Sequence, residues 1–351
     1  MPFYYPLKWK GFGAAQRKRT AAKLLDLRQQ IRDEIPTRTV RDTLLLATWN
    51  IRDFDSNKFG HGPRLDEAYY YIAEIISAFD LVALQEVNED LDALERVMRI
   101  LGHSWDFIAT DVTAGSSGNN ERMTFVYDKR KISFQNIAGE IVLPLKQLVE
   151  DEKQFARTPF LVSFQSGWFK FNLCTVHIYY GASSGAQLKR RIAEIEKIAK
   201  FLSTRADKDE NSYILLGDFN IVSPEHKTME ALVKQGFFVP DDLGPTNIHE
   251  TMYYDQIAFK TQEGRVQFGD SAGVFDFKKS VFKNGEQDTY FEFMDPKKRD
   301  FDEDGNPLDN AGKVQYYENT WRTFQMSDHL PLWVELKIDF SEEYLINIRD
   351  S

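Results

Sequence analysis

The sequence Tyr213-Ile214-Leu215-Leu216-Gly217-Asp218-Phe219-Asn220 predicts a short buried strand that ends in a turn. Its apolar side chains run without interruption into a glycine, which is typical of a buried strand followed by a sharp change of direction. Asp218 and Asn220 lie two residues apart, so in an extended chain their side chains point to the same face. A carboxylate and an amide placed there suit a metal-bound or phosphate-bearing substrate. The alternative for this stretch alone is an Asx-rich turn without chemistry.

Polar residues recur where other predicted strands begin or end. They are Asn50 after 44–48, Glu86 after 80–84, His177 after 169–176, Asp255 inside 253–259, and Asp328 and His329 before 332–338. If these positions converge, they form an oxygen-rich site with two histidines. Such a site suits Mg²⁺ or Mn²⁺, which prefer carboxylate, amide and water ligands, whereas zinc favours nitrogen and sulfur. The histidines can then shuttle protons or bind phosphate, each oriented by a carboxylate.

The length and composition are those of a globular protein. With 351 residues, of which 42% are hydrophobic, the chain can bury a large core. Predicted strands and helices alternate loosely, with several consecutive strands, which favours a layered α/β sandwich in one domain. No apolar run is long enough to span a bilayer, no signal-peptide pattern opens the chain, and the only cysteine is Cys174. We therefore expect a reduced, cytoplasmic protein.

Charge is unevenly distributed along the chain. The net charge of −10 argues against a broad basic platform for nucleic acid, but residues 1–40 hold 9 Lys and Arg against 3 acidic residues. We expect these residues to form a basic N-terminal arm with a helix over 14–35, ended by Pro36. Its basic face is either a solvated face of a docked helix or a contact for polyanions, such as nucleic acid or an anionic membrane, or for a partner protein.

Residues 41–351 are expected to form the catalytic domain, with an acidic insertion around 260–325. Within the insertion, Asp300, Asp302 and Asp304 followed by Gly305 reproduce the first half of a calcium-binding loop. The glutamate expected at the twelfth position is replaced by Ala311. Two interpretations remain open, a weak Ca²⁺ site and a solvated acidic turn.

Six short motifs together resemble the signatures of the endonuclease/exonuclease/phosphatase superfamily. In chain order they are Thr48-Trp49-Asn50-Ile51, Leu84-Gln85-Glu86-Val87, Thr175-Val176-His177, Leu216-Gly217-Asp218-Phe219-Asn220, Tyr254-Asp255-Gln256-Ile257 and Ser327-Asp328-His329-Leu330-Pro331. They cover about residues 43–338, and the closest resemblance within the superfamily is to pancreatic-type deoxyribonuclease. The resemblance implies a four-layered sandwich of two packed, mainly antiparallel β-sheets flanked by helices.

The resemblance also implies roles for the site residues. A divalent metal would bind Glu86, helped by Asn50 and Asp328. His177 and His329 would act as an acid–base pair. The remaining implied roles are Glu121 as the acidic partner of His177, Asp255 as the group that orients His329, Asp218 and Asn220 as positioning groups for water and phosphate, and Arg157 as a phosphate contact.

The activity implied is Mg²⁺-dependent hydrolysis of DNA phosphodiester bonds by a deoxyribonuclease-like endonuclease. The alternatives are a phosphatase or phospholipid phosphodiesterase of the same superfamily, and a binding module without catalysis. Two departures weaken the expectation of minor-groove reading in duplex DNA. Asn88 and the region of Asn119 stand near the positions where a deoxyribonuclease carries a groove-inserting arginine and a stacking tyrosine.

Overall fold

Two β-sheets form the centre of the computed structural model, which describes residues 2–8, 12–54, 57–112, 120–144, 148–149, 154–209, 211–261 and 268–350. The first sheet has the order β10 (Phe268–Val274), β11 (Leu332–Lys337), β1 (Thr43–Phe54), β2 (Leu81–Asn88), β4 (Glu121–Asp128) and β3 (Trp105–Ala109). The second has the order β5 (Ser133–Glu140), β6 (Phe160–Ser166), β7 (Phe169–His177), β8 (Ser212–Asp218) and β9 (Asp255–Lys260). The pairs β1–β2 and β7–β8 are parallel and the other pairs are antiparallel.

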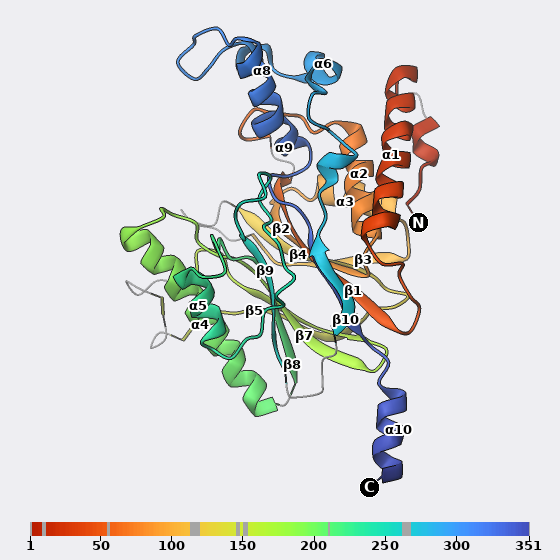
Figure 1. Ribbon diagram of the computed structural model, residues 1–351, viewed down its shortest axis with the longest axis vertical. Coiled ribbons are helices and arrows are strands. Elements are labelled where there is room, and N and C mark those ends of the chain that lie inside the picture. The colour runs from red at the N-terminus through yellow and green to blue at the C-terminus, as the bar shows by residue number, and fades with distance from the viewer. Residues whose placement is uncertain are drawn as a thin grey trace.

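Alternating side chains divide the core into layers. In β1, Leu44 and Leu46 belong to the cluster between the two sheets, whereas Leu45 and Ala47 face the helices. This period of two places successive residues of a strand on opposite faces of its sheet. The outer face of the second sheet packs in the same way, with Leu215 of β8 against Ile198 of the long helix α4 (Gly185–Asp209). The predicted four-layered sandwich is confirmed (Figure 1).

Helices cover both outer faces. On the first sheet lie α1 (Ala14–Glu34), α2 (Asp66–Ser77) and α3 (Asp92–Leu101), and on the second lie α4 and α5 (Lys227–Val233). A short 3-10 helix, η1 (Tyr5–Lys8), precedes α1. The helix predicted at 14–35 corresponds to α1. Three of its basic residues pair with acidic residues elsewhere in the chain: Arg19 bonds the buried Glu67, Arg28 lies 3.4 Å from Glu74, and Lys23 pairs with Glu286. This geometry corresponds to the docked-helix alternative.

Residues 275–326, which we call the accessory lobe, contain short helical segments and one isolated β-bridge, between Phe301 and Pro307. The helical segments are η4 (Phe277–Lys279), α6 (Gln287–Tyr290), η5 (Phe291–Phe293), α7 (Pro296–Asp300), α8 (Asn310–Tyr316), the π-helical turn η6 (Tyr317–Trp321) and α9 (Arg322–Gln325). Figure 1 shows the lobe beyond one end of the sandwich, beside α1. Gln30 of α1 donates to the Asp276 carbonyl at 2.8 Å and accepts from Ser280 at 2.6 Å. The arm helix and the lobe are thus in direct contact.

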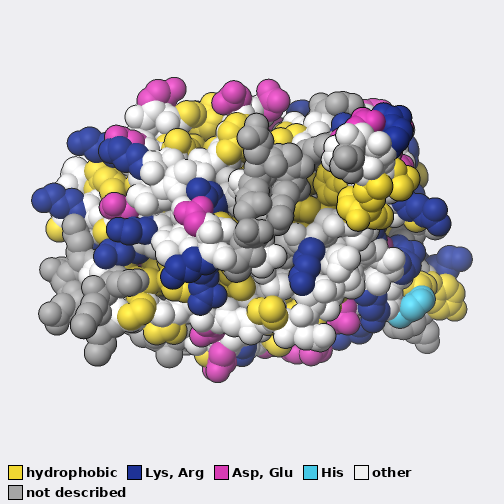
Figure 2. All heavy atoms as spheres, turned by 90° about the horizontal axis from the view of Figure 1, so that it is seen from below, with side chains coloured by type: hydrophobic (Ala, Val, Ile, Leu, Met, Phe, Trp, Pro, Cys, Tyr) yellow, Lys and Arg dark blue, Asp and Glu magenta, His cyan; other side chains and the backbone are white. Residues whose placement is uncertain are grey.

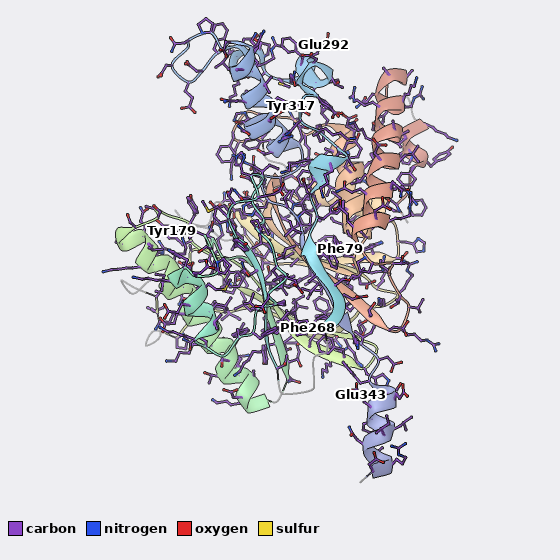
Figure 3. All side chains as sticks on the ribbon, viewed as in Figure 1. Phe79, Tyr179, Phe268, Glu292, Tyr317 and Glu343 are labelled. Carbon is purple, nitrogen blue, oxygen red and sulfur yellow. The ribbon has the colours of Figure 1, made fainter. Side chains whose placement is uncertain are left out.

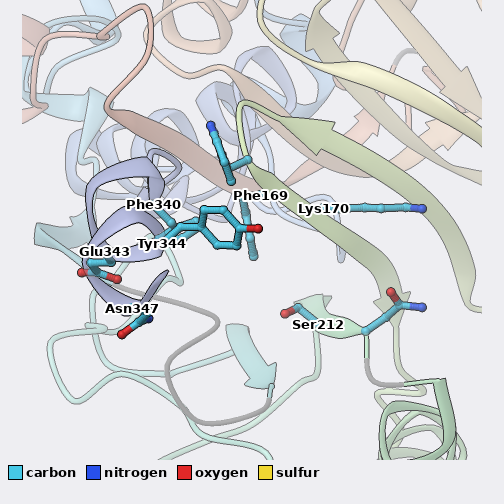
Figure 4. Close-up of a pocket in the computed structure, with 9 residues that line it drawn as sticks. Phe169, Lys170, Ser212, Phe340, Glu343, Tyr344 and Asn347 are labelled. Atoms are coloured by element: carbon cyan, nitrogen blue, oxygen red, sulfur yellow. The ribbon is translucent and has the colours of Figure 1, made fainter. Parts of the chain in front are cut away.

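The opposite end of the sandwich carries α10 (Ser341–Asp350), the last helix of the chain. A pocket of about 440 Å³ lies between α10 and the first residues of β7 and β8, lined by Trp168, Lys170, Ser212 and Tyr344 among others (Figure 4). Viewed from this end, the described side chains mix basic, acidic and hydrophobic types (Figure 2). Within the described ranges, no helix is both long enough and apolar enough to cross a membrane.

Candidate functional site

The strand ends singled out in the sequence converge at one end of the sandwich. Because β7 and β8 are parallel and β9 is antiparallel to β8, His177, Asp218 and Asp255 stand side by side in register. Asn50 comes from β1 and Glu86 from β2 in the facing sheet. His329 enters just before β11, where its backbone carbonyl accepts a hydrogen bond from the Trp49 indole at 2.9 Å.

Asp218 lies at the centre of this group. Its Oδ2 atom accepts a hydrogen bond from Asn50 Nδ2 at 3.1 Å. The same oxygen is 3.5 Å from His177 Nε2 and 3.9 Å from His329 Nε2. Asp218 is 2% exposed, so these contacts are made largely out of water, where electrostatic interactions are stronger. One carboxylate oxygen therefore faces both histidines.

The far side of His177 faces an acidic residue. His177 Nδ1 lies 3.0 Å from Oε2 of Glu121, the partner that the resemblance assigned to it. Arg157 Nε in turn donates to Glu121 Oε2 at 2.7 Å. Burial alone would raise the pKa of Glu121, but His177 and Arg157 outweigh it and hold that pKa well below the usual value. The guanidinium expected to contact phosphate is therefore engaged with a buried carboxylate, and its side chain is only 11% exposed.

His329 has a similar arrangement. Its Nδ1 lies 2.7 Å from Asp255 Oδ2, an oxygen that also accepts from the Thr246 hydroxyl at 2.6 Å. Burial lowers the pKa of His329, but the carboxylates of Asp255 and Asp218 more than offset this and hold it well above the usual value. Asp255 thus lies beside His329, the residue that the resemblance gave it to orient.

Glu86 lies beside the first pair, in an environment that favours a bound cation. Its carboxylate accepts from Asn50 Nδ2 at 3.1 Å and from the Asp53 amide at 3.0 Å. Burial, reinforced by the carboxylates of Glu121 and Asp328, raises the pKa of Glu86, although His177 acts in the opposite sense. Among the residues that the structure describes, the buried Asn50 Oδ1 has no hydrogen-bond partner. A divalent cation would relieve this crowding of carboxylates and could use the unpartnered oxygen, so the residues fit Mg²⁺ or Mn²⁺.

Asp328, the third residue expected at the metal, lies at the edge of the site. Its side chain is 36% exposed and lies 3.6 Å from Arg52 Nε. Within the described ranges, two groups of acidic and histidine residues are close enough to share a cation, each with ligand atoms within 4.8 Å of one another. They are Glu86, Glu121 and His177, and Asp218, Asp255 and His329.

Three residues of the site have left-handed backbone conformations. Asp53, Glu86 and Asn220 have φ angles of 43°, 60° and 55°, a region that residues other than glycine seldom adopt. Asn220 is fixed in this conformation because its amide N–H donates to Asp218 Oδ1 and its side-chain Nδ2 to the Ile178 carbonyl, both at 2.8 Å. The site is therefore held in one geometry by its own hydrogen bonds.

Three residues of the site were not predicted from the sequence: Asp53, Thr246 and Arg191. Arg191 is buried in α4, and its Nη1 donates to the Asn220 carbonyl at 3.1 Å. None of the three follows an apolar strand directly, which was the signal used for the others. A polar residue in the middle of a helix is normally solvent-facing, so nothing local marks Arg191.

The acidic turn is elsewhere and is organised by its own hydrogen bonds. Asp302 Oδ1 accepts from the amides of Asp304 and Asn306 at 3.0 and 2.7 Å. The Asp300 carboxylate pairs with Arg299 and with Lys313, the latter at 3.0 Å. These contacts match the interpretation as a solvated turn, and the turn contributes to neither of the candidate cation groups found among the described residues. The position of Asn119 lies outside the described residues.

The sequence matches no family model and no curated protein. Its fold, however, is similar to that of several solved structures. An endonuclease/exonuclease/phosphatase family protein from Bacteroides thetaiotaomicron superposes with a TM-score of 0.53 at 16% identity, covering 85% of this chain and 99% of that one. The chain thus has the fold of proteins of that family, which confirms the fold that the six motifs predicted.

Two further neighbours carry functional names. The catalytic domain of human Nocturnin with a bound sulfate anion gives a TM-score of 0.52 at 14% identity, covering 85% of this chain and 96% of that one. A mannosyl-6-phosphatase from Bacteroides thetaiotaomicron gives 0.52 at 17% identity, covering 84% and 99%. At these identities the likeness establishes the fold alone. Nothing in these neighbours points specifically to a pancreatic-type deoxyribonuclease.

Proposed function

We propose that this protein is a metal-dependent phosphoesterase that hydrolyses phosphodiester bonds of nucleic acid. The observation that carries the proposal is the position of Asp218 Oδ2, which faces Nε2 of both His177 and His329 beside Glu86. Two carboxylate–histidine pairs converging on a third carboxylate supply both an acceptor and a donor of protons within one site. The fold shared with endonuclease/exonuclease/phosphatase proteins supports phosphorus as the reacting centre.

We assign the following catalytic roles to residues of the chain. In place of the pair of acid–base histidines expected from the resemblance, we assign the role of base to Asp218, whose Oδ2 faces both imidazoles. It accepts a proton from the water whose oxygen attacks phosphorus. His329, kept protonated by Asp255, stabilises the charge that develops on the phosphate. His177, oriented by Glu121, donates a proton to the leaving oxygen as the old P–O bond breaks. A divalent cation held by Glu86, Asn50 and Asp328 would neutralise phosphate charge and polarise the P–O bonds.

For the substrate we propose DNA, and we expect contacts to the strand rather than deep reading of the minor groove. Asn88, which stands near the groove-inserting position of a deoxyribonuclease, is 5% exposed and donates to Asp53 at 3.3 Å. A buried amide cannot reach into a groove. We also infer a reducing compartment such as the cytoplasm, with which the free, buried Cys174 agrees.

A substrate panel tests the proposal. Plasmid DNA, single-stranded DNA, RNA, a phosphomonoester and a phospholipid would be incubated with the protein in Mg²⁺ or Mn²⁺, with EDTA as the metal-free control. We expect cleavage of DNA that is lost in EDTA, in Glu86→Ala and in Asp218→Asn, and retained in the exposed lobe variant Glu292→Ala. Full activity in EDTA, or hydrolysis of the phosphomonoester or the lipid alone, contradicts the proposal.

A further inference from the structure

Two tyrosines, Tyr254 and Tyr180, lie one after the other between His329 and the surface of the protein. The Tyr254 ring lies 5.6 Å from the His329 ring, with an interplanar angle of 34°. The Tyr180 ring follows at 6.3 Å from Tyr254, at 85°. Tyr180 is 55% exposed and Tyr254 is half-buried. We call Tyr180 and Tyr254 the aromatic ledge. Tyr254 contacts the imidazole of His329 in the proposed reaction centre, and Tyr180 is exposed to solvent.

The ledge is held rigidly from the protein side. Arg191, which is 1% exposed, places its guanidinium carbon 5.0 Å from the centre of the Tyr180 ring. The same guanidinium donates to the Tyr180 carbonyl at 2.8 Å and to the Asn220 carbonyl at 3.1 Å. The Tyr254 carbonyl accepts from the Phe219 amide at 2.8 Å. Ring and backbone are thus fixed together, which lowers the entropy cost of binding a ligand on them.

Two arginines of α4 lie against the rings in and beside the ledge, Arg191 against Tyr180 and Arg190 against Tyr179. The neighbouring Tyr179, which Figure 3 labels near the start of α4, has the Arg190 guanidinium 4.3 Å from its ring centre. Arg190 Nε also lies 3.1 Å from the buried carboxylate of Glu194. The same carboxylate accepts a hydrogen bond from the Tyr179 amide, also at 3.1 Å. Exposed aromatic rings backed by arginines are the surfaces on which unpaired nucleobases stack.

We propose that the aromatic ledge binds a planar ring carried by the substrate next to the scissile phosphate, and that this ring is a nucleobase of a single strand. This inference rests on the proposed function, since it takes His329 as part of the reaction centre. A sugar ring could also pack on a tyrosine. The guanidinium groups that back the rings favour a nucleobase, because arginine adds cation–π stabilisation to bases stacked on aromatic side chains.

Binding to two matched oligonucleotides tests the ledge directly. One is a short fluorescein-labelled oligothymidylate, and the other has the same length and phosphates but abasic sites. Their affinities would be measured by fluorescence anisotropy in Asp218→Asn, the background chosen to prevent cleavage. We expect Tyr180→Ala in this background to weaken binding of oligothymidylate by roughly 5- to 100-fold, the range for loss of a base-stacking aromatic side chain. Binding of the abasic strand should not change.

Two further variants make the result specific. Tyr180→Phe keeps the ring and should keep the affinity for oligothymidylate. Tyr344→Ala removes a tyrosine of similar exposure, 54%, at the opposite end of the molecule and should change neither affinity. Equal weakening of both strands by Tyr180→Ala would assign the ledge to the sugar and overturn the nucleobase proposal, as would no weakening at all.

The outcome is separable from that of the proposed function. Hydrolysis of oligothymidylate by the wild type would be followed in parallel on denaturing gels. A base-dependent loss of binding without any hydrolysis would uphold the ledge and contradict the proposed function. Hydrolysis that Tyr180→Ala leaves unchanged, with unchanged binding, would contradict the ledge alone.

Discussion

Removing the Arg157 guanidinium separates two roles that the sequence and the structure give this residue. The resemblance implied a phosphate contact, whereas the structure places the guanidinium on Glu121. Arg157→Met keeps the length and apolar body of the side chain but removes the 2.7 Å hydrogen bond from Arg157 Nε to Glu121 Oε2. We expect Arg157→Met to lower the free energy of unfolding and to lower kcat more than it raises KM, because the loosened Glu121 no longer orients His177.

The size of the stability loss follows from burial. The side chains of Arg157 and Glu121 are 11% and 6% exposed, and Nε and Oε2 are 2.7 Å apart. Removing one partner of a buried ion pair leaves an uncompensated charge and typically costs about 3–5 kcal/mol. The pKa of Glu121 is lowered in the folded state, so the pair stabilises the protein above the carboxyl's unfolded pKa and loses this effect as pH falls. The difference between wild type and variant should therefore shrink below about pH 4.

Urea unfolding at neutral and acidic pH measures this loss, with Arg205→Met on the exposed surface of α4 as the control. The double variant Arg157→Met/Glu121→Gln should recover part of the stability, because the unpaired charge is gone, but it should not recover kcat. Unchanged stability of Arg157→Met, together with a raised KM and a flatter salt dependence of DNA binding, would refute this reasoning. That pattern would support the phosphate contact by Arg157 that the resemblance implied.

Three further outcomes follow from the remaining geometry. His177→Ala and His329→Ala should each lower kcat by roughly 10²–10⁴-fold with unchanged circular dichroism, and near-normal turnover would remove that histidine from the mechanism. Deletion of residues 1–40 should lower the melting temperature and leave the salt dependence of DNA binding unchanged, since the arm pairs with the body; a weaker salt dependence would show phosphate contacts. Ca²⁺ should raise the melting temperature of the wild type and of Asp302→Ala/Asp304→Ala equally, and an increment confined to the wild type would establish a calcium site.

The convergence of the site could be predicted from the sequence because strand ends carry their own signal. Leu215 and Leu216 predict a buried strand, and the change to Gly217 and Asp218 predicts where it ends. In a sandwich with parallel pairs, such ends meet at one edge, so candidate residues are found before their partners are known. The pairing of Arg157 with Glu121 could not be found in this way, because Arg157 lies before β6 of the second sheet and Glu121 opens β4 of the first, so neither follows an apolar strand. That choice depends on how two sheets stack.

The accessory lobe could not be predicted for a different reason. Its α6 and α7 have 4 and 5 residues, too short to display a helical period. The lobe is held instead by long-range aromatic packing, such as Tyr290 against Trp321 at 5.6 Å and Tyr71 against Phe282 at 5.8 Å. An aromatic-rich composition indicates a large hydrophobic core but does not predict which rings contact each other.

The lobe and the arm also change how the proposed domain division is understood. Residues 1–40 and the insertion around 260–325 are separate in the sequence, yet Gln30 bonds Asp276 and Ser280, and Lys279 lies 3.0 Å from Glu34. The lobe then runs directly into the site, where Ser327 donates to the Asn50 carbonyl at 2.6 Å. We infer that arm and lobe form one layer that steadies the strand carrying Asn50. The boundary at residue 40 would then mark a change in charge and not the edge of an independently folding unit.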